Sequence, residues 1–348
     1  MYEKDGERYF IVDGHIHFWD ASPANQANKY GTGFIKCFYD YQQNLSPPEF
    51  KWSLEKFEKY SEDDLLHDIF EVGYADVAIF QPTYLTDFYT NGFNTTEQCA
   101  AVAEKHPGKF IVNGAFDPRD GEAGLEALEA LVERYQLKGV KLYTAEWKGD
   151  SRGWRLDSPE AYLYLAKCRE LGVRNVHIHK GPTIWPLNRD AFDVSDVDDA
   201  ATDFPELNFI VEHLGLPRLE DFCWIATQEP NVYGGFAVAM PLMYTRPRYF
   251  AQIIGELCYW LDENRLLFGS DYAIWQPKWL VEQFVDFQIP DDLLSEYAPL
   301  TPDVKRKILG LNAARLYDLE VPAELDVLSV AEIAPARPAV GSEPVSPV

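Results

Sequence analysis

Eight short apolar segments, mostly separated by helical segments, are the feature that most constrains how this chain can fold. They occupy residues 9–18, 77–82, 110–116, 139–143, 174–179, 208–213, 231–236 and 265–271. Strands that alternate with helices form parallel sheets, and eight such strands close into a barrel. The sequence therefore predicts an α/β fold, a (β/α)8 TIM barrel with long loops over the face where its strands end.

The residues between and after these segments are expected to form helices, a long loop and a tail. Helices are expected at residues 61–70, 95–105, 121–135 and 159–171. Residues 19–60 mix aromatic residues with Asn, Gly and Pro without a clean period, so we expect a long loop over the first strand, where active-site walls arise. Residues 321–348, rich in Pro, Ala and Val, are expected to form an irregular tail beyond a barrel domain of residues 1–320. This tail is either flexible or a docking arm for a partner subunit.

Composition narrows the classes of partner. The net charge of −25 would repel nucleic acid and anionic membranes, so the expected partner is a small-molecule substrate. No leader opens the chain and no apolar run approaches the roughly 20 residues of a membrane helix, which predicts a cytoplasmic protein. The five cysteines are scattered and lack CxxC spacing, which indicates reduced thiols rather than disulfides or a thiolate zinc site. We also expect a homo-oligomer or a mixed assembly with a related subunit.

The first strand ends in two histidines, His15 and His17, separated by one residue. Side chains two apart on a strand point to the same side, so both imidazoles project from the end of this strand. Two converging imidazoles are a natural pair of metal ligands. The alternative is a pair of partly buried histidines satisfied by ordinary hydrogen bonds.

Other polar residues fall at the same end of the predicted barrel. His179 closes the fifth strand, His213 the sixth and Asp271 the eighth. TIM barrels keep their active sites at this face, and imidazoles with one carboxylate suit Zn, Fe or Mn better than Ca or Mg. His177 lies two residues deeper than His179, and we interpret it as a partner of the ligands or a core residue.

Four motifs resemble the amidohydrolase superfamily, specifically its amidohydrolase-2 branch, over a span from about Phe10 to Tyr317. The motifs are Gly14-His15-Ile16-His17, Val176-His177-Ile178-His179-Lys180-Gly181, Glu212-His213-Leu214-Gly215 and Phe268-Gly269-Ser270-Asp271-Tyr272. The resemblance implies a divalent metal held by His15, His17, His179 and Asp271. It implies that His213 polarises the substrate or binds a second metal, and that Asp271 also moves a proton of water. The branch includes decarboxylases and hydrolases.

The number of metal ions depends on residues near the fourth strand. Many two-metal relatives carry a carboxylated lysine at the end of that strand, but Lys141 lies inside the segment 139–143 and looks too early to bridge metals. Glu146, just beyond the strand, is either a bridging carboxylate or a solvated loop residue. One ion is expected, and two if Glu146 binds. Two Fe or Mn/Fe ions would favour oxygen activation over water activation.

Several aromatic residues around the predicted barrel mouth suit an apolar substrate pocket. The residues predicted to contact the substrate are Tyr84, Tyr143, Trp147, Trp275 and Arg152. The leading hypothesis is a metal-dependent hydrolase or decarboxylase of a small organic acid or ester, with Asp271 and His213 as catalytic residues. The alternatives are a dinuclear Fe or Mn/Fe monooxygenase on the same barrel and a non-catalytic partner subunit.

Overall fold

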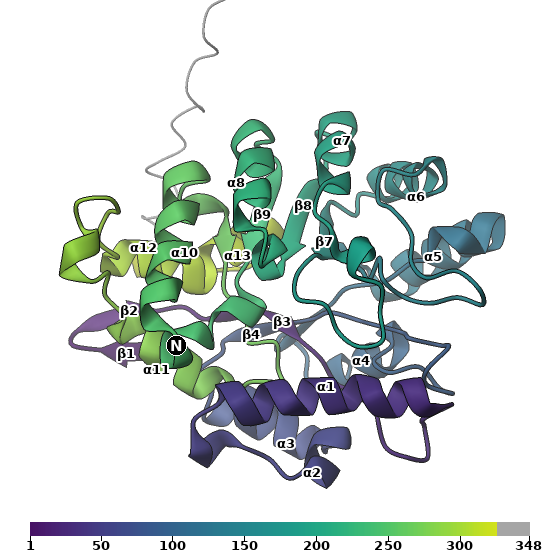
Figure 1. Cartoon of the computed structure of the whole chain (residues 1–348), viewed down its shortest axis with the longest axis horizontal. Coiled ribbons are helices and arrows are strands. Elements are labelled where there is room, and N and C mark those ends of the chain that lie inside the picture. The colour runs from purple at the N-terminus through teal and green to yellow at the C-terminus, as the bar shows by residue number, and fades with distance from the viewer. Residues whose placement is uncertain (326–348) are drawn as a thin grey trace, which may run out of the picture.

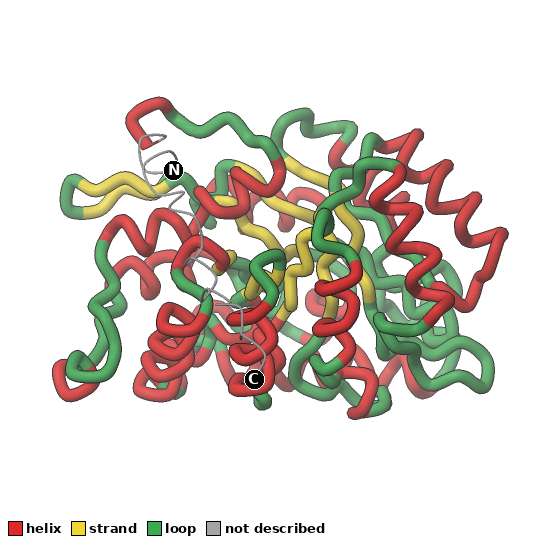
Figure 2. Tube along the Cα trace, turned by 90° about the horizontal axis from the view of Figure 1, so that it is seen from above, coloured by secondary structure: helices red, strands yellow, loops and turns green. Residues whose placement is uncertain are grey.

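The computed structural model describes residues 1–325 and contains one parallel strand inside each of the eight predicted segments. The strands are β3 (Val12–Ile16), β4 (Val77–Phe80), β5 (Phe110–Val112), β6 (Gly139–Leu142), β7 (Asn175–His179), β8 (Asn208–Glu212), β9 (Val232–Gly235) and β10 (Leu266–Leu267). Figure 2 shows these strands in the middle of the molecule with helices around them. The residues 326–348 of the predicted tail lie outside the described residues.

Backbone hydrogen bonds join the strands into a ring. β3, β4 and β5 are consecutive neighbours in one sheet, and β6 to β10 are consecutive neighbours in a second. Gly114 joins the sheets on one side, because its N–H donates to Gly139 (2.9 Å) and its carbonyl accepts from Lys141 (2.8 Å). On the other side, the Gly14 N–H donates to Phe268 (3.0 Å). The chain is an α/β TIM barrel, as the alternation of segments predicted.

The helices connect successive strands, and the four predicted ones are confirmed. The helices are α1 (Lys29–Leu45), α2 (Leu54–Glu58), α3 (Glu62–Leu66), α4 (Thr96–Ala103), α5 (Gly121–Tyr135), α6 (Pro159–Glu170), α7 (Asp196–Asp203), α8 (Leu219–Gln228), α9 (Leu242–Thr245), α10 (Pro247–Trp260), α11 (Pro277–Asp286), α12 (Pro302–Arg306) and α13 (Asn312–Tyr317). Within residues 1–325, no helix combines the length and the apolar character that crossing a membrane requires.

The expectation of a loop over residues 19–60 was wrong, because this segment contains the long helix α1, drawn in dark purple in the lower half of Figure 1. The Asn28 side chain caps α1 by accepting from the Tyr30 N–H (2.9 Å). Phe34 and Phe38, four residues apart, are buried on one side of the helix. Gly31 allows close packing, since a Cβ there would lie 2.6 Å from the Phe88 carbonyl oxygen.

The sequence reading also missed an N-terminal hairpin of β1 (Tyr2–Lys4) and β2 (Glu7–Tyr9). Apolar side chains fill the end of the barrel where the strands begin. Four strands contribute to this cluster, and α13 and the residues before it pack against them; its members include Val12, Ile79, Ile210, Leu267, Leu311, Ala314 and Tyr317. The predicted ligand residues lie at the opposite end, where the strands finish.

Candidate metal centre

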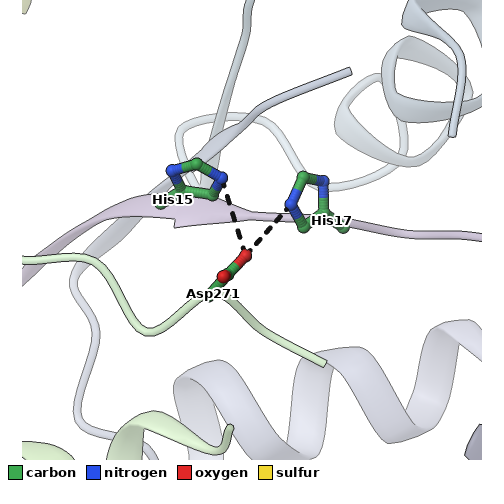
Figure 3. Close-up of side chains that lie close together, drawn as sticks. All are labelled: His15, His17 and Asp271. Carbon is green, nitrogen blue, oxygen red and sulfur yellow. Dashed lines mark hydrogen bonds and ion pairs between the residues drawn. The ribbon is translucent and has the colours of Figure 1, made fainter. Parts of the chain in front are cut away.

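Three buried side chains converge where β3 and β10 end. His15 Nε2 lies 3.6 Å and His17 Nε2 lies 3.2 Å from Asp271 Oδ1, as Figure 3 shows. The exposed fractions of the three residues are 2%, 5% and 4%. One potential ligand atom from each residue lies within 4.8 Å of the other two. His17 and Asp271 are 254 residues apart in the chain. The ends of the two strands bring them together with His15 into a group able to share one ion.

The backbone around this group is specialised. Asp271 has a φ of +58° and His213 a φ of +69°, in the left-handed region that residues other than glycine seldom adopt. Such conformations cluster at functional sites because they aim a side chain in a direction that regular structure does not allow. Asp13 links the two chain segments that carry the group, since its Oδ1 accepts from the Ser270 N–H (2.8 Å) and from the His15 N–H (3.3 Å).

The other two predicted ligand histidines lie beside the group. The ring centroids of His213 and His15 are 5.2 Å apart, and His213 Nε2 lies 3.0 Å from His179 Nδ1. Among the described residues, His179 Nε2 and His213 Nδ1 have no hydrogen-bond partner although both are buried. The structure therefore places both imidazoles next to the His15, His17 and Asp271 group. Their role as ligands stays a prediction.

Glu212 is a site residue that the sequence reading missed. Its Oε2 lies 2.9 Å from His15 Nδ1, and its Oε1 lies 2.6 Å from His177 Nδ1. His177 Nε2 in turn lies 2.7 Å from the Tyr317 hydroxyl oxygen. Gly235 leaves room for this carboxylate, since a Cβ there would lie 2.2 Å from Glu212 Oε2. Its position one residue before His213, at the end of a strand, was the signal available in the sequence.

Lys141, which looks too early in its strand to bridge metals, nevertheless lies beside the ligand group. Its Nζ lies 3.4 Å from His15 Nε2, and the residue is buried. Lys141 is paired in register with His177, which faces the barrel interior two residues before His179. The lysine side chain is long enough to span that interval and reach the ligand group.

The pKa shifts favour the neutral imidazoles of His15, His179 and His213 and the ionised carboxylate of Asp271. Burial lowers the pKa of His15 to about 4 and that of His213 to about 3, and the Lys141 charge adds to both shifts. Burial alone would raise the pKa of Asp271, but the contact with His17 and the nearby His15 and His213 outweigh it and hold that pKa well below its usual range. Burial lowers the pKa of Lys141 to about 8. Neutral imidazoles and ionised carboxylates are the forms that bind metal ions.

Two cavities adjoin this group. The first, which we call the metal chamber, encloses about 20 Å³, and its lining residues include His17, His179, Asp271, Tyr143, Thr83 and Trp275. The second, which we call the side cavity, encloses about 400 Å³, and its lining residues include Thr83, Tyr84, Lys141, Tyr143 and Glu146. The α1 residues Phe38 and Tyr41 also line the metal chamber, so this helix supplies the wall expected from a loop.

Three of the five predicted substrate-binding residues line these cavities, namely Tyr84, Tyr143 and Trp275. Trp147 and Arg152 line neither of the two cavities and instead contact each other, with the guanidinium carbon 3.5 Å from the ring centroid. Glu146 is absent from the described ligand group, and its Oε1 accepts from the Thr86 N–H (3.2 Å) beside the side cavity.

Comparison with known proteins places this arrangement in a class. A TIM barrel with imidazoles and a carboxylate at its strand ends is the architecture of metal-dependent barrel enzymes. The amidohydrolase family model matches residues 12–319, so the chain belongs to this family and is an enzyme of the amidohydrolase superfamily. The motif resemblance predicted this membership. A search of curated proteins finds no match.

Solved structures share the fold at low sequence identity. An uncharacterized TIM-barrel protein from Bordetella bronchiseptica is 19% identical with a TM-score of 0.66, covering 88% of this chain and 98% of its own. A 5-carboxyvanillate decarboxylase from Novosphingobium aromaticivorans with bound manganese is 14% identical (TM-score 0.56; 89% and 97% covered). A probable 2-pyrone-4,6-dicarboxylic acid hydrolase from Acinetobacter baumannii is 12% identical (TM-score 0.54; 89% and 99% covered).

Proposed function

We propose that this enzyme is a metal-dependent hydrolase or decarboxylase of a small organic acid or ester, and that His15, His17 and Asp271 hold one Zn, Mn or Fe ion. The observation that carries the proposal is the convergence of these three buried side chains, with ligand atoms within 4.8 Å of one another. The solved decarboxylase with bound manganese and the probable hydrolase support it, since both share this fold.

The residues present fit a metal ion. Imidazole nitrogens with one carboxylate oxygen are the donor set that Zn, Fe and Mn accept. The unpartnered nitrogens of His179 and His213 leave further donor capacity in the described part of the chain. A divalent ion bound there lowers the pKa of water or polarises a substrate oxygen.

The protein groups around the ion then have separate tasks. The ionised Asp271 carboxylate would accept and return a proton, because its Oδ1 faces the Nε2 atoms of both His15 (3.6 Å) and His17 (3.2 Å). Glu212 holds His15 by its far nitrogen and so fixes the direction of Nε2. Trp275 and Tyr143 are among the side chains that line the metal chamber, whose volume of about 20 Å³ is room for about one water molecule.

The monooxygenase alternative relied on Glu146 as a bridging ligand. Its carboxylate contacts the Thr86 backbone beside the side cavity, and it does not belong to the ligand group found in residues 1–325. We therefore base the proposal on one ion and on water rather than oxygen chemistry.

Metal removal tests this proposal. The protein is stripped with a chelator, reloaded separately with Zn²⁺, Mn²⁺ or Fe²⁺, and assayed for CO₂ release from hydroxybenzoates and for hydrolysis of lactones and aryl esters. We expect activity on at least one of these classes in a reloaded sample and a loss of at least about tenfold after chelation, because the ion supplies the reactive water or the Lewis acid. Activity that is unchanged by chelation would contradict the proposal.

A further inference from the structure

The metal chamber is too small for an organic substrate, whereas the side cavity next to it is not. The chamber encloses about 20 Å³ and the side cavity about 400 Å³. Pockets for small organic ligands generally enclose roughly 300–1,000 Å³. Thr83 and Tyr143 line both cavities, so the two spaces meet at these side chains. An organic molecule that reacts at the metal chamber would therefore bind in the side cavity.

Two buried polar groups at this junction lack a partner. The Tyr143 hydroxyl and Thr83 Oγ1 make no hydrogen bond within the described residues, although the two side chains are only 6% and 3% exposed. Leaving a buried polar atom unpaired is unfavourable, and such atoms mark the position of a ligand or an ordered water. Both residues are thus free to donate to or accept from a molecule in the side cavity.

The charges that line the side cavity divide into paired and unpaired groups. Asp117 pairs with Arg119 (2.5 Å), Asp120 pairs with Lys148, and Glu97 accepts from the Tyr84 hydroxyl (3.0 Å). Among the described residues, Glu146 forms no ion pair within 4.0 Å, and its Oε1 accepts from the Thr86 N–H (3.2 Å). Burial raises the pKa of Glu146 to about 7, although the Thr86 contact and the more distant Arg119 charge oppose that shift. Lys141 has no carboxylate within 4.0 Å, and its Nζ lies 3.4 Å from His15 Nε2. Neither Glu97 nor Glu146 has an ion-pair partner among the described residues, but Glu97 is exposed to solvent whereas Glu146 is half-buried. Glu146 and the buried Lys141 are therefore the less solvated charges that line the cavity without an ion-pair partner.

We propose that the side cavity binds the substrate, and that this substrate is a small amino-substituted organic acid or its ester whose ammonium group pairs with Glu146 and whose carboxyl-derived group lies toward Lys141 and the metal chamber. The inference rests on the proposed function, which it narrows to one substrate class. Tyr84, Phe116 and Trp154 add aromatic walls suited to a cationic or aromatic ligand. Hydrogen bonds between ionised partners are about twice as strong as those between neutral ones, so both ends of such a molecule contribute to recognition.

The test measures binding rather than turnover. Calorimetric titrations of the metal-loaded protein compare three probes of similar shape, namely 4-(aminomethyl)benzoate, 4-methylbenzoate and 4-methylbenzylamine. We expect 4-(aminomethyl)benzoate to bind most tightly. In Glu146→Gln its affinity falls about tenfold or more, because the charge pair is lost while the amide oxygen still accepts from Thr86. The affinity of 4-methylbenzoate stays within about twofold in that variant.

Controls separate this pairing from a general change of charge or fold. Glu97→Gln removes a solvent-exposed carboxylate that lines the same cavity and accepts from the Tyr84 hydroxyl, and we expect it to change the affinity for 4-(aminomethyl)benzoate by less than about threefold. Circular dichroism and the thermal midpoint establish that each variant is folded. The inference is overturned if none of the probes binds, if 4-methylbenzoate binds as tightly as the amino acid probe, or if Glu146→Gln leaves all affinities unchanged.

The same samples distinguish failure of this inference from failure of the proposed function. Metal content is measured on each preparation before titration. Discrimination between the probes in a protein that binds no metal would contradict the proposed function and support the cavity assignment. A full complement of metal without discrimination between the probes would overturn the cavity assignment alone.

Discussion

Asp271→Asn is expected to weaken metal binding by more than about 100-fold. Asp271 supplies the one carboxylate of the ligand group, and its Oδ1 lies 3.2 Å from His17 Nε2 and 3.6 Å from His15 Nε2. Loss of a residue that merely orients a ligand typically costs 10–100-fold in metal affinity, so loss of the charged ligand itself is expected to cost more. The measurement is metal per chain after dialysis against buffered Zn²⁺ or Mn²⁺ at a series of free concentrations.

The substitution isolates charge from backbone effects. Asparagine adopts positive φ as readily as aspartate, so the φ of +58° at residue 271 remains accessible. Asp318→Asn is the matched control, because Asp318 also has a positive φ (+53°) but its side chain is 84% exposed and does not belong to the ligand group. We expect Asp318→Asn to bind metal like the unmodified protein. Equal metal affinity of Asp271→Asn and Asp318→Asn would show that Asp271 is not a ligand.

Glu212→Gln is expected to weaken metal binding by about 10–100-fold without removing any ligand. Glu212 contacts the nitrogens of His15 and His177 that face away from the ligand group, and its charge balances Lys141 in the buried interior. Burial alone would raise the pKa of Glu212, but His15, His177 and Lys141 outweigh it and hold that pKa well below its usual range, so the carboxylate is charged. A neutral amide would leave His15 less firmly held and would remove one of the two carboxylate charges near Lys141, leaving that of Asp271.

Metal affinity and thermal midpoint together test this positioning role. Glu206→Gln serves as the control, since the Glu206 side chain is 58% exposed and its nearest cationic partner, Arg169, lies 3.9 Å away. Glu212→Asp provides a rescue, because it keeps the charge while shortening the side chain, and we expect an affinity between those of Glu212→Gln and the unmodified protein. A Glu212→Gln variant that is less stable yet binds metal with unchanged affinity would limit Glu212 to a structural role.

The residues that the sequence identified share one property, which is a fixed position at the end of a strand. Strand alternation placed His15 and His17 on one side of β3, and the order of apolar segments placed Asp271 at the same face of the barrel. Both inferences needed only the period of a strand and the closure of a parallel ring. The strands all fell inside the predicted segments because each lies within a short, mainly apolar run, most of which is buried.

What the sequence could not supply depends on side-chain reach and on contacts between distant segments. Lys141 lies within β6, but its side chain extends to His15. No pattern in residues 139–143 predicts this contact. Glu212 acquires its role from two histidines on other strands, β3 and β7. Helix α1 escaped notice because glycine and asparagine interrupt its apolar pattern, while its stability comes from packing over the metal chamber.

The most direct measurement of the central claim is the position of the metal ion in crystals of the reloaded protein, located by anomalous scattering at the absorption edge of Zn or Mn. We predict one anomalous peak per chain about 2.0–2.2 Å from an imidazole nitrogen of His15, an imidazole nitrogen of His17 and a carboxylate oxygen of Asp271. A peak bound to other side chains, or crystals of fully loaded protein with no peak between these three residues, would contradict the account.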